Sequence, residues 1–89
     1  MAKTLQEALL PLRQRIDAVD EQLLTLLNER AQLAVSVGEV KQTFGETETI
    51  LKPEREAQII RRLQEANKSK LFPSDAVGAV WTEIISACR

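Results

Sequence analysis

The chain of 89 residues, 44% of them hydrophobic, has enough apolar material for one modest core, so we expect a single domain over residues 1–89. Twelve basic and 13 acidic residues are interspersed and leave a net charge of −1, which gives no electrostatic reason to expect nucleic acid or a membrane as a partner. Without histidine, and with Cys88 as the single cysteine, the sequence predicts no metal site, no internal disulfide and no catalytic triad.

A long amphipathic helix is predicted from about residue 5 to residue 44. Thr4 and Glu7 match a capping box at its start, and Gly45 is typical of a C-terminal stop. Pro11 predicts either a kink in the first turns or a later start. Apolar residues recur at alternating intervals of four and three, which is a heptad seam on one helix face. This apolar seam consists of Leu5, Leu9, Leu12, Ile16, Val19, Leu23, Leu26, Leu33, Val37 and Val40.

Two shorter helices are predicted to follow a polar connection at residues 45–52. The first begins with Pro53 and ends near residue 67, and the second follows Pro73 and runs over about residues 75–89. At about 1.5 Å per residue the long helix would measure about 60 Å and each short one about 22 Å. The short helices cannot cover the long one, so we expect an all-α fold in which the long helices of two chains pack together.

Charged residues interrupt the apolar seam of the long helix. The four-three spacing requires an apolar residue at position 30, where the sequence has Arg30. Lys41 follows eleven residues later, about 20° beyond three full turns, so both side chains point to the same side of the helix. They are about 16 Å apart along the axis, and a small anion could bind between the two cations. Arg13 lies about 42 Å from Lys41 along the same helix, so it is either unrelated or acts on a ligand of the other subunit.

The second predicted helix carries a carboxylate on its apolar face. Glu56 lies on the same helix face as Ile60 and Leu63, and Arg55 directly precedes it in the sequence. Structural explanations exist for each charge: Arg30 as a register device or a partner of a buried glutamate, Lys41 and Arg13 as solvated surface charges, and Glu56 as a favourable contact with the helix dipole. Only the joint arrangement favours a binding site.

The sequence resembles the all-helical class of chorismate mutases, and within it the amino-terminal domains of bifunctional chorismate mutase/prephenate dehydratases. The resemblance covers nearly the whole chain, and no single piece of it is decisive. The matching stretches are Leu12 to Asp17 with Asp20, Leu26 to Ala31, Val37 to Lys41, Pro53 to Gln58 and Trp81 to Arg89.

This resemblance implies an isomerase of phenylalanine and tyrosine biosynthesis that rearranges chorismate to prephenate as a cytoplasmic, intertwined homodimer without cofactor. Each site would contain both chains, with Arg30 holding one chorismate carboxylate and the partner subunit's Arg13 the other. Lys41 would donate to the ether oxygen, Glu56 would accept from the ring hydroxyl, and Arg55 would orient neighbouring carboxylates. The rearrangement is unimolecular and needs no nucleophile, which agrees with the composition.

Two positions depart from the family pattern. Lys52 stands where family members can carry an aspartate, which puts a contact with a substrate hydroxyl in doubt. Cys88 takes the place of a small polar residue on the last helix, and the chain stops at Arg89 before the glutamine or glutamate that would assist Lys41. We therefore expect a domain taken from a longer bifunctional chain, with weak activity.

Two other functions fit the same residues. A helical dimerisation module would use Arg30 only to set the register, and replacing it with leucine would then preserve or stabilise the fold. A regulatory domain would bind chorismate, and gain thermal stability from it, without forming prephenate.

Overall fold

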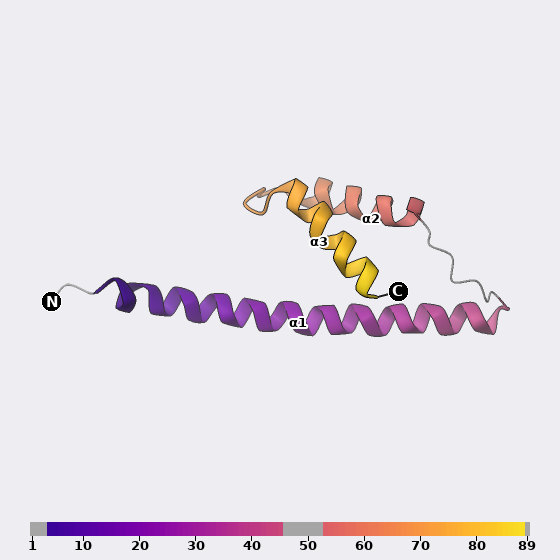
Figure 1. Cartoon of the computed structure of the whole chain (residues 1–89), viewed down its shortest axis with the longest axis horizontal. Helices are drawn as coiled ribbons and strands as arrows, with labels where there is room; N and C mark the ends of the chain where they lie inside the picture. The colour runs from indigo at the N-terminus through magenta and orange to yellow at the C-terminus, as the bar shows by residue number, and fades with distance from the viewer. Residues whose placement is uncertain (1–3, 46–52, 89) are drawn as a thin grey trace. The chain divides into compact units, whose positions relative to one another are not determined.

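The computed structural model describes residues 4–45 and 53–88, and all of its regular secondary structure over these ranges is helical. In chain order the helices are α1 (Leu5–Thr43), α2 (Pro53–Ala66) and α3 (Ser74–Ala87) (Figure 1). This confirms the all-α class and the order of one long and two short helices. The chain divides into two compact units, residues 1–33 and 34–89. The single domain over residues 1–89 stays a prediction.

The start of α1 follows from its capping residue. The Thr4 Oγ1 accepts a hydrogen bond from the Glu7 backbone N–H at 3.1 Å, and the Thr4 carbonyl accepts one from the Ala8 N–H at 3.0 Å. These bonds satisfy donors that the first turn of a helix leaves unpaired. Helix α1 therefore begins at Leu5 and includes Pro11, so the alternative of a later start at Pro11 is wrong.

The end of α1 is set by Gly45, as the sequence predicts. Gly45 has a φ of +79°, and its N–H donates to the Gln42 carbonyl at 3.0 Å. Glycine adopts this left-handed conformation without the steric cost that a Cβ brings. The helix ends at Thr43, one residue earlier than expected, because residues 44 and 45 form the terminating turn.

Helices α2 and α3 begin at prolines or just after them. Pro53 is the first residue of α2, a position where the missing N–H costs nothing, and the helix ends at Ala66, one residue before the expected end. Pro73 is the N-cap of α3, so the helix starts at Ser74, one residue earlier than predicted. Helix α3 ends at Ala87, and its C-cap is Cys88.

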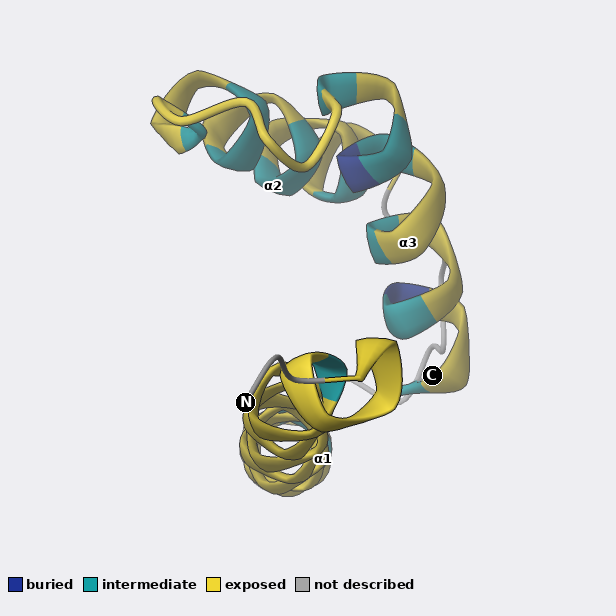
Figure 2. Cartoon of the chain, turned by 90° about the vertical axis from the view of Figure 1, so that its left-hand side faces the viewer, coloured by how far each residue is buried: buried dark blue, intermediate teal, exposed yellow. Residues whose placement is uncertain are grey.

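Helices α2 and α3 contact each other, and α3 contains the buried residues of the described chain. The two buried side chains, Val77 and Ile85, are 5% and 8% exposed and both belong to α3 (Figure 2). On α2 the half-buried residues follow one another at alternating intervals of three and one, which marks one face of the helix. They are Glu56, Ile59, Ile60, Leu63 and Gln64. In Figures 1 and 2, α3 starts beside the end of α2 and diverges from it toward its own C-terminus.

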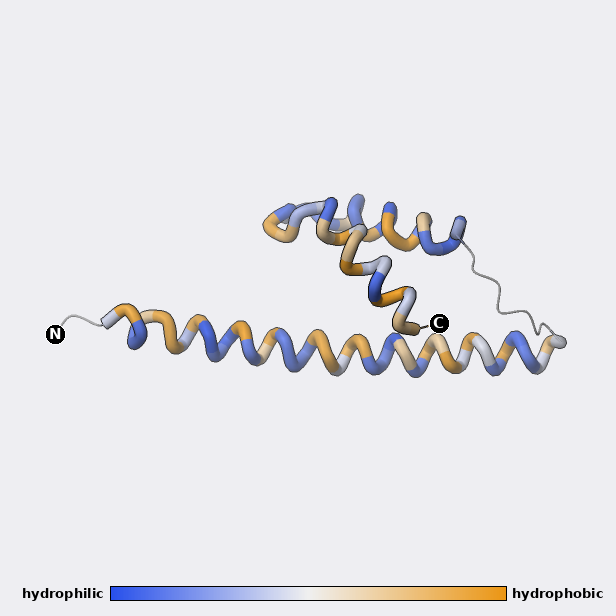
Figure 3. Tube along the Cα trace, in the orientation of Figure 1, coloured by the Kyte–Doolittle hydropathy of each residue, from blue (hydrophilic) through white to orange (hydrophobic). Residues whose placement is uncertain are grey.

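Helix α1 has no buried residue, and most of its large apolar side chains are exposed. Hydrophobic positions recur along its whole length between hydrophilic ones (Figure 3). Leu12, Ile16, Val19 and Leu23 in the apolar seam each expose more than half of their surface. An exposed apolar surface of this extent is typical of an interface.

The turn between α2 and α3 contains a residue in an unfavourable backbone conformation. Lys70 has a φ of +56°, which costs a non-glycine residue about 1 kcal/mol or more. We expect Lys70→Gly to raise the free energy of unfolding by about 0.5–1 kcal/mol, because glycine removes this cost. Urea denaturation at fixed protein concentration measures the change. Ser69→Gly is the matched control and should instead be slightly destabilising; a loss of stability in both variants would contradict the prediction.

Candidate functional site

The first unit contains two of the expected site residues, Arg13 and Arg30. Both belong to α1; Arg13 is exposed and Arg30 is half-buried. Arg30 lies four residues after Leu26 and three before Leu33, so on this continuous helix it occupies the position of the apolar seam that the sequence assigns to it. Its guanidinium offers a planar set of donors for a carboxylate.

Lys41 lies in the last turn of α1 and is half-buried. A cation in this position is stabilised by the partial negative charge at the C-terminal end of the helix dipole. Its ammonium can donate up to three hydrogen bonds to oxygen atoms of a ligand. Lys41 therefore provides a positioned point charge close to the Gly45 turn.

The first turn of α2 contains Arg55 and Glu56. Glu56 is half-buried and belongs to the face of α2 that also carries Ile60 and Leu63, as the sequence predicts, whereas Arg55 is exposed. The partial positive charge at the start of the helix favours the carboxylate of Glu56. A carboxylate accepts hydrogen bonds from hydroxyl groups, and the adjacent guanidinium can bind a second carboxylate.

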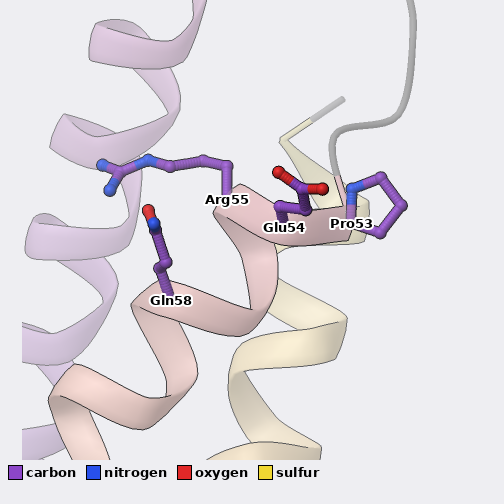
Figure 4. A pocket seen from close by; sticks show the side chains of 4 residues that line it. All are labelled: Pro53, Glu54, Arg55 and Gln58. Carbon is purple, nitrogen blue, oxygen red and sulfur yellow. The ribbon is translucent and has the colours of Figure 1, made fainter.

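A shallow pocket of about 550 Å³ lies against this same turn of α2. Its lining residues are Pro53, Glu54, Arg55 and Gln58 (Figure 4). The side chains of Arg55 and Gln58 extend to the same side of the helix. Gln58 was not among the residues predicted from the sequence, although its spacing of three from Arg55 is the signal that places two side chains on neighbouring positions of one helix face.

Of the two departures from the family pattern, Cys88 and Lys52, only Cys88 belongs to the described residues. Cys88 is a half-buried free cysteine, and its backbone N–H donates to the carbonyls of Ile84 and Ile85 at 3.1 and 3.2 Å, so it terminates α3. Lys52 lies outside the described residues. Among the described residues, no group of three or more histidine, cysteine, aspartate or glutamate side chains is placed to hold a metal ion.

The structure thus places Arg55 and Gln58 on the lining of one pocket, whereas Glu56 of the same turn belongs to the half-buried face of α2. Arg13 and Arg30 belong to the first unit, and Lys41, Arg55, Glu56 and Cys88 belong to the second. The convergence of these residues on one ligand is a proposal. What the described residues define is an all-helical protein whose half-buried cations and carboxylate suit a small anionic ligand.

Comparison with known proteins identifies the family. Residues 12–89 match the family chorismate mutase type II, and the chain belongs to this family. The chain is 42% identical to a bifunctional chorismate mutase/prephenate dehydratase of Neisseria gonorrhoeae over 99% of its length. It is 44% and 43% identical to proteins of the same name from Aquifex aeolicus and Pseudomonas aeruginosa, over 92% and 93% of its length.

These matches confirm the resemblance and the expected enzyme class, chorismate mutase, which is an isomerase. The chain spans 23% of the length of each of these three relatives. No solved structure gives a significant match. Over the residues that the structure describes, no helix is both long enough and apolar enough to cross a membrane.

Proposed function

We propose that this domain converts chorismate to prephenate in a site shared between two chains. The observation that carries the proposal is the family match over residues 12–89, a range that contains every site residue named from the sequence. The names of the three relatives contain the same activity. The proposal concerns the mutase reaction alone, because the chain corresponds to less than a quarter of those relatives.

The reaction is a unimolecular rearrangement, so the domain has to position and stabilise and does not have to attack. Arg30 and the partner subunit's Arg13 bind the two carboxylates of chorismate and hold its compact diaxial form. Glu56 accepts a hydrogen bond from the ring hydroxyl, and Arg55 orients the neighbouring carboxylates. The half-buried positions of Arg30 and Glu56 support these roles, because a partly desolvated charge interacts more strongly with its ligand.

Lys41 supplies the electrostatic part of catalysis. The ether oxygen of the breaking bond becomes more negative in the transition state, and the ammonium of Lys41 stabilises it there more than in the ground state. A millionfold acceleration corresponds to about 8 kcal/mol, which substrate positioning together with one or two fixed donors can supply. The proposed substrate-binding set also includes Cys88 and Lys52, of which Lys52 lies outside the described residues.

The exposed apolar seam of α1 supports a homodimer. Side chains such as Leu12, Ile16 and Val19 are more than half exposed, and pairing of two α1 helices would remove them from water. Arg13 lies about 42 Å from Lys41 of its own chain along the helix, so the two residues cannot share a ligand. In the paired helices, Arg13 instead binds the ligand in the site of the other chain. We assign the protein to the cytoplasm, where soluble substrates of biosynthesis are found.

The proposal is tested by following the loss of chorismate absorbance with the purified chain. We expect turnover, and in Lys41→Ala we expect a decrease of at least about 100-fold in kcat because a preorganised donor to the transition state is lost. Lys68→Ala, which removes an exposed lysine of the α2–α3 turn, is the matched control and should match the parent chain. Chorismate that raises the melting temperature without forming prephenate would contradict the proposal and favour a regulatory binding domain.

A further inference from the structure

Two amide side chains at the end of α2 bind the backbone of the following turn and helix. The Gln64 Nε2 donates to the Ser74 carbonyl at 3.0 Å, and this bond is partly buried. The Asn67 Nδ2 donates to the Phe72 carbonyl at 2.7 Å, and the Asn67 Oδ1 accepts from the Lys70 N–H at 3.1 Å. We call the Gln64 and Asn67 side chains with these three hydrogen bonds the polar clasp.

The polar clasp joins α2 and α3 at one end only. Gln64 belongs to the half-buried face of α2 that begins with Glu56, and the half-buried Asn67 follows directly after the helix ends at Ala66. The clasp lies where α2 ends and α3 begins, and from there the two helices diverge (Figure 1). Glu56 is therefore at the open end of this helix pair and the clasp at its closed end.

Gly78 on α3 lies next to the clasp, within ordinary van der Waals distance of the face of α2. A Cβ on Gly78 would lie 3.5 Å from the Gln64 Nε2 and 3.7 Å from the Ile60 Cγ2, so both side chains pass directly over this position. The Gln64 amide is thus held between the Ser74 carbonyl and the surface of α3. This contact fixes the direction in which α2 leaves α3.

A small rotation at the clasp becomes a larger displacement at Glu56. Eight residues separate Gln64 from Glu56, about 12 Å along the helix, so a rotation of about 5° moves the carboxylate by about 1 Å. A misplacement of about 1 Å can reduce the rate of a reaction that depends on positioning by about 100-fold. A carboxylate that accepts one hydrogen bond from a substrate hydroxyl is sensitive to such a shift, because hydrogen bonds need defined distances.

We infer that Gln64 and Asn67 are positioning residues, which act on the reaction through Glu56 by fixing the orientation of α2 against α3. This inference rests on the proposed function. Neither residue touches the substrate, so loss of the polar clasp should affect kcat far more than KM.

The experiment uses the double variant Gln64→Met/Asn67→Ala. Methionine keeps the length of Gln64 but has no amide donor, and alanine at position 67 removes both hydrogen bonds of the Asn67 side chain. We expect kcat to fall by about 10- to 100-fold and KM to change by less than about threefold. Glu65→Met/Lys68→Ala is the matched control, because it introduces the same side chains at the adjacent exposed positions.

A double-mutant cycle with Glu56→Gln separates positioning from a general structural role. If the polar clasp acts through Glu56, adding its two substitutions to Glu56→Gln should lower kcat by less than about twofold further. If the kcat losses of the clasp variant and of Glu56→Gln multiply when the substitutions are combined, the inference is wrong. It is also wrong if the clasp variant has the same kcat as the control. Circular dichroism and size-exclusion chromatography verify folding, and the single variants Gln64→Met and Asn67→Ala replace the double variant if it unfolds. An inactive parent chain would overturn the proposed function and this inference together, whereas an active parent with unaffected clasp variants would overturn the inference alone.

Discussion

Arg30→Ala is expected to lower kcat/KM by about 1000-fold or more while the helices and the dimer persist. A charged hydrogen-bond pair with a substrate carboxylate contributes several kcal/mol when it is partly shielded from water, and about 4 kcal/mol corresponds to about 1000-fold. Folding should survive because Arg30 lies on a helix without buried residues. Steady-state loss of chorismate measures the activity, and circular dichroism with size-exclusion chromatography measures the fold.

Arg15→Ala is the matched control for Arg30→Ala. Arg15 is an exposed arginine of the same helix, and no role in the site is proposed for it. The control should retain the activity of the parent chain. Unfolding or dissociation of Arg30→Ala, together with a dimer that Arg30→Leu preserves or stabilises, would contradict the binding role and favour a dimerisation module in which Arg30 sets the helix register.

Mixing two inactive variants, Arg13→Ala and Lys41→Ala, should restore activity if each site draws on both chains. In the mixed dimer one site combines the intact Lys41 of one chain with the intact Arg13 of the other, and the second site carries both substitutions. With random exchange about half of the dimers are mixed, so about one quarter of the parent activity should return. Each variant alone should remain at least about 100-fold below the parent chain.

The control for this experiment is a mixture of Arg30→Ala with Lys41→Ala. The proposed site takes both of these residues from the same chain, so in a mixed dimer one site lacks Arg30 and the other lacks Lys41. No activity should return from this pair. Equal recovery in both mixtures, or none in either after subunit exchange has been demonstrated, would contradict the assignment of Arg13 to the other chain.

The helix boundaries were predictable because local chemistry determines them. The Thr4 cap, the Gly45 turn and Pro53 as a first helical residue each act within a few residues of the chain, and each was found where the sequence indicated. The start of α3 shifted by one residue because Pro73 took the N-cap position, which left Ser74 inside the helix. Periodicity marks the apolar seam of α1 as a contact face, but it does not define which element packs against that face.

The candidate site was predictable only in part. The sequence placed Arg30 on the apolar seam of the long helix and Glu56 on the half-buried face of the second, and the structure agrees with both. The face predicted for this helix ends at Leu63, whereas Gln64 also belongs to it and the half-buried Asn67 follows directly after the helix. Their polar side chains interrupt an apolar pattern. They donate to the backbone carbonyls of Ser74 and Phe72, which follow ten and five residues later in the chain, and side-chain periodicity does not predict such bonds.

The exposed apolar seam of α1 has a consequence for how stability depends on the amount of protein. Only two side chains of the described residues are buried, so an isolated chain gains little free energy from folding. In the proposed dimer, folding and association become one bimolecular equilibrium, and the melting temperature rises with protein concentration by mass action. Dilution would then remove activity by dissociating and unfolding the chain, even though no catalytic group has changed.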